Sequence, residues 1–132
     1  MAGKIRFDLV SPEKLLYSAE ADMVTVPGRE GDFAVLAGHE PFISIIRTGL
    51  INVKGGDDGD MRIFVRGGFA EVNAEGLIVL AEEAMPADDL DAAALDARIK
   101  DAEEDLADAK DDAARAKAAE ALEGLRQMRI HA

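Results

Sequence analysis

The chain has 132 residues, a formal net charge of −12 and no cysteine, a size that supports one packed core with a small appendage but not two large domains. The acidic surplus excludes the lysine- and arginine-rich surface that nucleic-acid binding requires, and the lack of cysteine excludes disulfides, thiolate nucleophiles and sulfur-ligated metals. No signal peptide and no apolar run of the roughly 18 residues of a membrane span are predicted, so membrane association is expected only through a partner.

Glycine is distributed unevenly along the chain. Eleven of the twelve glycines precede residue 77, and after Met85-Pro86 the sequence is rich in alanine, leucine and charged residues. Because glycine punctuates strands and turns whereas alanine and leucine favour helices, the sequence predicts a β domain over residues 1–86 and a helical hairpin over residues 87–132.

The β part contains short apolar runs at intervals of about ten residues. Such even spacing favours an antiparallel β-sandwich or a flattened barrel. Ile5–Val10 alternates apolar and polar side chains, as expected of a strand with one buried face. The further predicted strands are Leu15–Tyr17 running into Met23–Val26, then Gly31–Leu36, Ile43–Ile46, Gly49–Lys54, Met61–Gly67, Phe69–Asn73 and Gly76–Glu82.

The pair Gly67-Gly68 interrupts an apolar run inside the β part. A glycine pair can form an anion-binding loop, but no lysine followed by serine or threonine comes after it, so the phosphate-loop motif is absent. The pair is therefore interpreted as a bulge or a tight corner of a strand.

The period of the apolar residues changes from Asp88 onward. Two stripes at helical spacing are predicted, one on a helix of about 20 residues and one on a second helix after Lys110-Asp111-Asp112, where an aspartate can serve as the N-cap. The short link requires the helices to fold back antiparallel. The second stripe is mostly alanine, so the pairing is expected to be weak and the hairpin able to open. The stripes are Leu95, Ile99, Ala102, Leu106 and Ala109, then Ala114, Ala118, Ala121, Leu125 and Met128.

No cluster of catalytic or metal-binding residue types is apparent. His39 and His131 are the only histidines, neither has a second ligand at metal-binding spacing, and the helical carboxylates fall mainly on the solvent side of the stripes. The sequence predicts a protein that is not an enzyme and holds no metal.

Several stretches, in order, resemble the epsilon subunit of bacterial F-type ATP synthases. The longest is VPGREGDFAVLAGHEPF at residues 26–42, followed by TGLI at residues 48–51. FDLVSPE at residues 7–13, VRGGFAEV at residues 65–72 and LIVLAE at residues 77–82 match further strands of that family. The resemblance covers the whole β part in order and the hairpin by pattern.

The resemblance implies a non-catalytic rotor subunit with an α+β fold, in which a ten-stranded antiparallel β-sandwich precedes a two-helix hairpin. It implies binding to the gamma subunit through the face that carries Ser11, His39 and Ser44. It implies contact with the c-ring through the turn Arg29, Glu30, Gly31 and Asp32, although exposed charges there also solvate a turn without any partner. The location it implies is the cytoplasmic face of the bacterial inner membrane, reached only through the complex.

The resemblance also implies that the hairpin can extend toward the alpha and beta subunits and inhibit ATP hydrolysis. Arg115, Lys117, Arg126 and Arg129 are the candidate inhibitory contacts, although basic residues near a helix C-terminus also offset the helix dipole.

Relatives that bind ATP carry an apolar-Asp-x-x-Arg-Ala motif, whereas this chain reads LDAAAL at residues 90–95. The motif arginine is missing, which disfavours regulatory ATP binding through Asp91 and Arg98, and no cofactor is predicted. Two further readings are a free small-ligand-binding β module that dimerises through its hairpin and an acid-base isomerase on a β-barrel.

Overall fold

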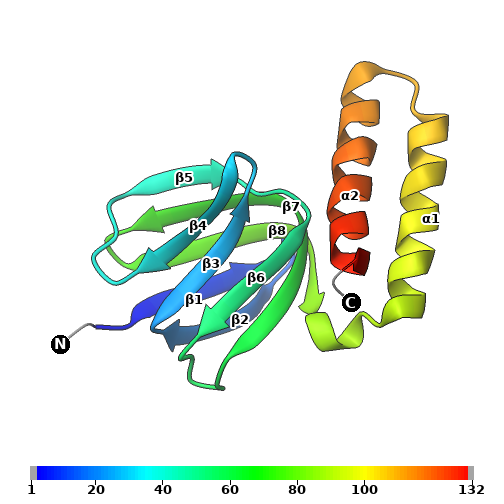
Figure 1. Cartoon of the computed structure of the whole chain (residues 1–132). Helices are drawn as coiled ribbons and strands as arrows, with labels where there is room; N and C mark the ends of the chain where they lie inside the picture. The colour runs from blue at the N-terminus through cyan, green and yellow to red at the C-terminus, as the bar shows by residue number, and fades with distance from the viewer. Residues whose placement is uncertain (1–2, 131–132) are drawn as a thin grey trace.

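The computed structural model describes residues 3–130, which form eight strands followed by a short 3-10 turn and two helices (Figure 1). The helices stand at one end of the β-sandwich and the first strand begins at the other. The elements are β1 (Ile5–Val10), β2 (Leu15–Ala21), β3 (Met23–Gly28), β4 (Gly31–Leu36), β5 (Phe42–Ile45), β6 (Gly49–Lys54), β7 (Met61–Asn73), β8 (Gly76–Pro86), the turn Ala87–Asp89, α1 (Ala92–Asp108) and α2 (Asp112–Ile130).

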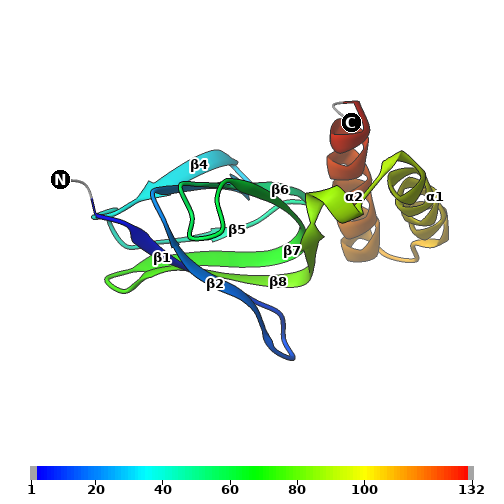
Figure 2. The same ribbon diagram turned by 90° about the horizontal axis from the view of Figure 1, so that it is seen from below.

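One strongly curved sheet makes both layers of the sandwich, which Figure 2 shows edge-on. Its strands follow the order β2-β1-β8-β7-β6-β3-β4, and β5 pairs with β7. All pairs are antiparallel except β1 with β8, which run parallel. The expected β-sandwich is confirmed, and this one pair departs from the expected antiparallel arrangement because the chain passes through the other layer before β8 returns beside β1.

The expected ten strands appear as eight, because β7 and β8 are long continuous strands of 13 and 11 residues. The N-terminal part of β7 pairs with β6 and the C-terminal part with β5. Between them lie Gly67 and Gly68, with φ of 69° and 111°. The predicted strand corner at this glycine pair is confirmed.

The corner reverses which residues of β7 face the core. Ile63 and Val65 belong to the core before the corner, and Ala70 and Val72 belong to it afterwards, so the parity changes from odd to even. The pairing of β7 with β8 keeps one register on both sides of the corner. This is possible because the inward-facing positions of β8 also shift by one residue at the corner. Phe64 and Phe69 therefore both point out of the sandwich.

The sandwich core consists of aliphatic side chains and Phe7 from the inward positions of both layers. The side of the sandwich between β4 and β5 is closed by Phe33 and Phe42, whose ring centroids lie 5.0 Å apart in an edge-to-face arrangement. Such aromatic pairs stabilise contacts beyond their buried area.

The two helices lie antiparallel, as the stripes predict (Figure 1). Helix α1 is shorter than expected, with 17 residues, because Asp91 caps it by accepting a hydrogen bond from the N–H of Ala94 at 2.8 Å. Asp111 accepts in the same way from Ala114 at 2.7 Å, so the predicted aspartate cap of the second helix is confirmed. Helix α2 runs through Gly124, which does not end it.

Candidate functional site

A row of five outward-facing apolar side chains crosses five strands of the sandwich. The register places one from each of β2, β1, β8, β7 and β5 side by side. Three of them are well exposed: Leu15 at 57%, Phe69 at 41% and Ile45 at 55%. The neighbouring Ile43 of β5 is 70% exposed. We call these residues the outer row: Leu15, Val10, Leu80, Phe69 and Ile45, with Ile43 beside it.

Ser11 and Ser44 are chain neighbours of two members of this outer row, but Ser44 pairs with the core residue Ala70, so its side chain lies on the opposite face of β5 from Ile45. Ser11 directly follows Val10 of β1 and Ser44 precedes Ile45 of β5, so their strands are three strand spacings apart, about 14 Å. The hydroxyl of Ser11 accepts from the N–H of Lys14 at 3.2 Å, and that of Ser44 donates to the carbonyl of Ile45 at 3.0 Å.

His39 lies away from both serines, in the exposed loop between β4 and β5. It lines a shallow groove together with Lys4, Ile5 and Arg6, which lie at the opposite end of β1 from Ser11. Its Nδ1 donates to the carbonyl of Glu40 at 2.7 Å. The structure does not bring His39, Ser11 and Ser44 into one cluster.

The turn between β3 and β4 is a tight hairpin in which Gly28 pairs with Gly31. Arg29 and Glu30 are exposed at its tip. Asp32 instead forms an ion pair with Arg47, whose other terminal nitrogen donates to the carbonyl of Gly28 at 2.6 Å. Asp32 therefore contacts the base of the turn, and the side chains of Arg29 and Glu30 are left exposed at its tip.

A second outward row of apolar side chains lies under the helical hairpin. Leu50 of β6, Phe64 of β7 and Met85 of β8 are direct cross-strand neighbours. They pack with residues of both helices, among them Leu95 and Leu125, and Phe64 is completely buried. We call Leu50, Phe64 and Met85 the hairpin pad.

Helix α2 approaches the backbone of the sandwich at Thr48. Thr48 is 1% exposed and is the one polar residue counted as buried within residues 3–130. Glu120 accepts two hydrogen bonds from it, one from the backbone N–H and one from the hydroxyl at 3.2 Å. One turn further on, Gly124 lies so close that an added Cβ would be 2.2 Å from the carbonyl oxygen of Thr48.

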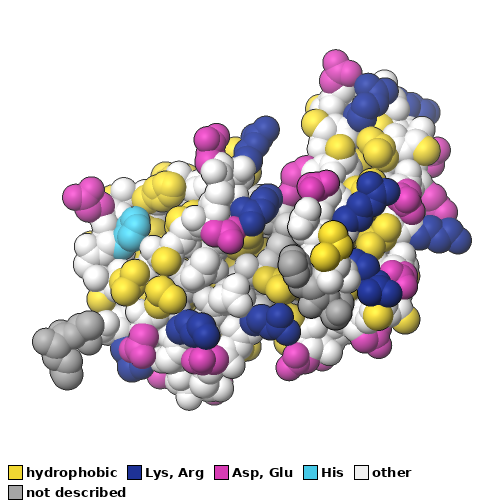
Figure 3. Space-filling model, in the orientation of Figure 1, with side chains coloured by type: hydrophobic (Ala, Val, Ile, Leu, Met, Phe, Trp, Pro, Cys, Tyr) yellow, Lys and Arg dark blue, Asp and Glu magenta, His cyan; other side chains and the backbone are white. Residues whose placement is uncertain are grey.

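The four basic residues predicted to make inhibitory contacts all have acidic partners within the chain. Figure 3 shows basic and acidic side chains interspersed along the hairpin. The pairs are Arg115 with Asp112 at 3.2 Å, Lys117 with Glu82 at 3.4 Å, Arg126 with Glu103 at 3.1 Å and Arg129 with Asp96 at 2.8 Å. Three of these pairs join α2 to α1 or to the sandwich, so they exist only while the hairpin is folded.

Asp91 and Arg98, the two candidate nucleotide residues, each have a structural partner within the chain. Asp91 is the cap of α1. Arg98 donates to Glu83 of β8 at 2.6 Å, and its guanidinium carbon lies 5.5 Å from the centroid of the Phe64 ring. These two contacts of Arg98 hold α1 against the sandwich.

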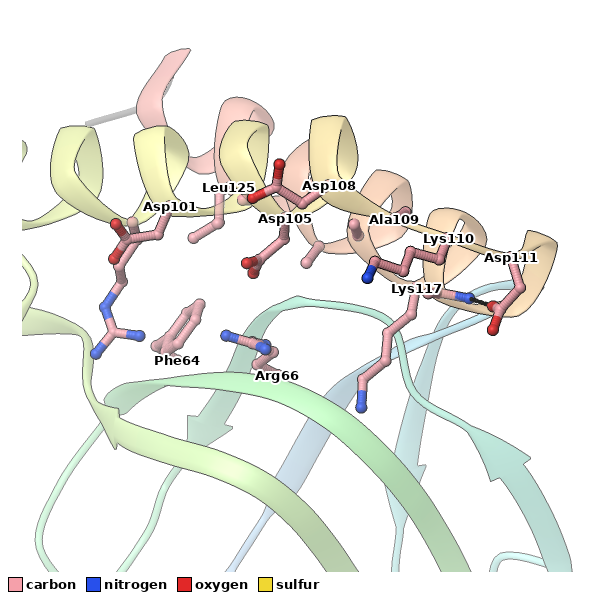
Figure 4. Close-up of a pocket in the computed structure, with 15 residues that line it drawn as sticks. Phe64, Arg66, Asp101, Asp105, Asp108, Ala109, Lys110, Asp111, Lys117 and Leu125 are labelled. Atoms are coloured by element: carbon pink, nitrogen blue, oxygen red, sulfur yellow. Dashed lines mark hydrogen bonds between the residues drawn. The ribbon is translucent and has the colours of Figure 1, made fainter.

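A groove of about 480 Å³ separates the hairpin from β7 (Figure 4). Asp105 of α1 and Arg66 of β7 face each other across it. Three more aspartates, Asp101, Asp108 and Asp111, line the same groove. Four basic side chains, Arg66, Arg98, Lys110 and Lys117, also line it, so the formal charges of the groove balance.

The histidine and carboxylate side chains of residues 3–130 include no group of three or more that is placed to hold a metal ion. His131 lies outside the described residues. None of the described helices has both the length and the apolar character needed to cross a membrane.

Two ionisable groups near the loop between β6 and β7 have shifted pKa values. Burial raises the pKa of Tyr17, and the carboxylates of Asp58 and Asp57 add to this effect. The N–H of Gly55, which donates to Asp60 at 2.8 Å, lowers the pKa of that carboxyl, and Lys54 contributes to the lowering.

The sequence analysis missed the outer row, the hairpin pad and the contact of Glu120 and Gly124 with Thr48. One signal was available for the pad: Ile63-Phe64-Val65 is apolar without alternation, which indicates burial on both faces of a strand. The contact at Thr48 joins residues 72 positions apart, and no local pattern predicts it.

Comparison with known proteins agrees with the resemblance found in the sequence. The family model for the β-sandwich domain of the ATP synthase delta/epsilon chain matches residues 4–87. The ATP synthase epsilon chain of Parvibaculum lavamentivorans is 54% identical over 129 residues, or 98% of each chain. That of Maricaulis maris is 52% identical over 120 residues, which cover 90% of this chain and 89% of the relative.

Solved structures with the same fold belong to mitochondrial ATP synthases. A chain in the Euglena gracilis ATP synthase, determined with OSCP, F1 and the c-ring, superposes with a TM-score of 0.75 at 26% identity and covers 97% of this chain and 81% of that one. A chain of the Tetrahymena thermophila central stalk and c-ring has a TM-score of 0.67 at 12% identity, which supports the fold alone. Because the family model matches the β-sandwich and a bacterial relative is 54% identical over 98% of each chain, this chain belongs to the family of ATP synthase epsilon chains.

Proposed function

We propose that the chain is a non-catalytic rotor subunit of an F-type ATP synthase and couples rotation of the c-ring to the catalytic head through the gamma subunit. Its place is then at the cytoplasmic face of the bacterial inner membrane, held there by the complex. The observation that carries this proposal is the outer row, an exposed apolar stripe on a sandwich whose core is already complete. Exposed apolar patches of this kind mark protein interfaces.

The outer row fits the gamma subunit better than it fits a small ligand. It runs across an open sheet face, whereas small-molecule sites are concave. Its centre is apolar and the adjoining row carries Asp8 and Glu71, an arrangement typical of an interface with a polar rim. Of the residues that the family resemblance assigns to gamma, Ser11 directly follows Val10 of this row, whereas His39 lies in the loop between β4 and β5.

The c-ring contact is assigned to the tip of the turn between β3 and β4. Arg29 and Glu30 are exposed there, and Asp32 at the base of the turn pairs with Arg47. Charged residues on a tight turn suit a polar contact, in which charge complementarity governs register and association rate more than affinity.

Capture of the gamma subunit tests the assignment of the outer row. Ile43→Asp places a charge beside the row, and we expect it to weaken gamma binding by at least tenfold. Ile130→Asp is the matched control, because Ile130 is 71% exposed but lies at the end of α2. Equal binding by the two variants, both correctly folded, would remove the outer row from the interface.

The hairpin is proposed to inhibit ATP hydrolysis when it leaves the sandwich and extends toward the alpha and beta subunits. Undocking breaks the pair of Lys117 with Glu82, and separation of the helices frees Arg126 and Arg129 for acidic partners. Replacing Arg126 and Arg129 with alanine should raise the hydrolysis rate of the assembled synthase without changing gamma binding. An unchanged hydrolysis rate contradicts the inhibitory role.

ATP is expected to bind weakly or not at all to the isolated chain. A triphosphate needs arginines to offset its charge, whereas Arg98 is engaged with Glu83 and the four basic side chains of the adjacent groove are matched by four aspartates. Isothermal titration tests this expectation. Tight binding that is lost in Arg98→Ala would show that Arg98 leaves Glu83 to hold the nucleotide.

A further inference from the structure

We propose that Glu120 and Gly124 of α2 form a latch on Thr48, and that this latch sets the balance between the docked and the undocked hairpin. The regulatory consequence rests on the proposed function, because docking keeps α2 against the sandwich, with Lys117 paired to Glu82, and away from other subunits. The latch itself is a property of the isolated chain.

The first part of the latch is the carboxylate of Glu120. It accepts from both polar donors of Thr48, the backbone N–H and the hydroxyl. Thr48 is 1% exposed, so these donors lose their contact with water when the hairpin docks. A buried donor without an acceptor is costly, and hydrogen bonds to a charged acceptor are stronger than neutral ones.

The second part is the missing side chain of Gly124. Thr48 fills the space that a side chain at this position would need. Its carbonyl oxygen, Cβ and carbonyl carbon all lie within 2.9 Å of where a Cβ would be. Glycine is unfavourable inside a helix, yet this glycine lies six residues before the end of a 19-residue helix. The close approach to Thr48 gives it a physical reason to be there.

The two parts act on the same residue from successive turns of one helix face. Residues 120 and 124 are one turn apart and therefore point to the same side of α2. Glu123, which precedes Gly124, is exposed and has the side chain of Gln127 as its hydrogen-bond partner. It serves as a matched control, being a carboxylate on the same turn that does not touch Thr48.

The remaining contacts between hairpin and sandwich do not fix α2 in this way. The pad is apolar and non-directional, and the pair of Lys117 with Glu82 joins side chains that are at least half exposed. Exposed ion pairs contribute little to stability. The contact at Thr48 is the one place where α2 meets the sandwich backbone directly, among the contacts described for residues 3–130.

The test measures docking in the full-length chain without any partner. Because the chain has no cysteine, spin labels can be placed at Glu75→Cys, in the turn between β7 and β8, and at Ala116→Cys, on the exposed face of α2. Double electron-electron resonance then reports the distance distribution between sandwich and hairpin. The parent chain should give one narrow distribution.

Gly124→Ala should shift most of the population to a broad, undocked distribution, even though alanine raises the helix propensity of α2. Glu120→Ala should raise the ratio of undocked to docked chain about tenfold, and Glu120→Gln, which keeps an acceptor for the Thr48 N–H, should raise it less. Glu123→Ala should leave the ratio unchanged. Ala113→Gly, which weakens α2 at an exposed position, should remain docked.

A single narrow distribution in Gly124→Ala, or equal ratios in Glu120→Ala and Glu123→Ala, would overturn the latch. Glu120 lies outside the sandwich core, so its variants remain informative if Gly124→Ala fails to fold. The gamma-capture experiment separates the two proposals: a failed latch leaves gamma binding through the outer row unaffected, and failed gamma binding leaves the docking measurement intact.

Discussion

Replacing Phe64 with alanine should release the hairpin while leaving the sandwich folded. Phe64 belongs to the long strand β7 but points away from the sandwich core into the cluster formed with α1 and α2. Its neighbour Ile63 points into the core. Two adjacent residues of one strand therefore support two different parts of the molecule.

The size of the effect follows from what docking buries. Phe64 is completely buried in the docked state, and burying a phenylalanine side chain contributes about 1.5–3 kcal/mol. The guanidinium of Arg98 over its ring contributes roughly 0.5–1 kcal/mol more. The sum of about 2–4 kcal/mol corresponds to a shift of the docking equilibrium of roughly 30- to 1000-fold.

Native-state hydrogen exchange distinguishes release of the hairpin from unfolding of the sandwich. Most of the stability of helices in proteins comes from tertiary packing, so undocking should speed exchange of the α1 and α2 amides by this factor. Amides of β1 and β3 should keep their protection. In Ile63→Ala the reverse holds, with a loss of about 2–5 kcal/mol in the free energy of unfolding of the sandwich.

The result that refutes this reasoning is a Phe64→Ala chain in which strand and helix amides lose protection equally. That outcome would mean that hairpin and sandwich unfold as one cooperative unit. Retained helix protection together with weakened strands would mean that Phe64 supports the core.

Three further predictions concern pH and truncation. In Tyr17→Phe, the loss of stability at alkaline pH should be reduced, as measured by urea unfolding at several pH values. The raised pKa of Tyr17 gives stability that is complete below the ordinary value of 10.0 and is lost as pH rises through the folded-state pKa. In Asp60→Asn, the acid side of the same profile should flatten: the lowered pKa of Asp60 gives stability that is present above the ordinary value of 3.8 and is lost as pH falls through the folded-state pKa. Deleting residues 87–132 should preserve capture of gamma, because the outer row lies in the sandwich, but should promote self-association through the uncovered pad, which light scattering detects.

The parts of the fold that depend on local sequence could be predicted. The spacing of Leu95, Ile99, Ala102 and Leu106 places them on one side of a helix, and the structure buries or half-buries all four. Asp111 was predictable as a cap because capping involves residues three positions apart. These relations need no knowledge of distant contacts.

The parts that depend on register between strands could not be predicted. The outer row becomes visible only when Val10 is placed beside Leu80 and Phe69 beside Ile45, and this requires the parallel pairing of β1 with β8. Leu122 was missed for a related reason: it widens the stripe of α2 on the side that meets the pad, so its burial depends on where the sandwich lies.

The glycine pair at residues 67–68 explains how one strand contributes to both the outer row and the hairpin pad. A Cβ at Gly68 would lie 1.8 Å from the carbonyl oxygen of Leu80, and φ at both glycines is positive, a conformation that residues with a Cβ rarely adopt. The corner turns Phe64 toward the hairpin and Phe69 into the outer row. A strand without this reversal would place residues 64 and 69 on opposite faces, because their separation is odd. A partner bound to the outer row therefore contacts the same strand that carries the pad for α1 and α2, and the two surfaces are joined by the backbone of β7 without any intervening loop.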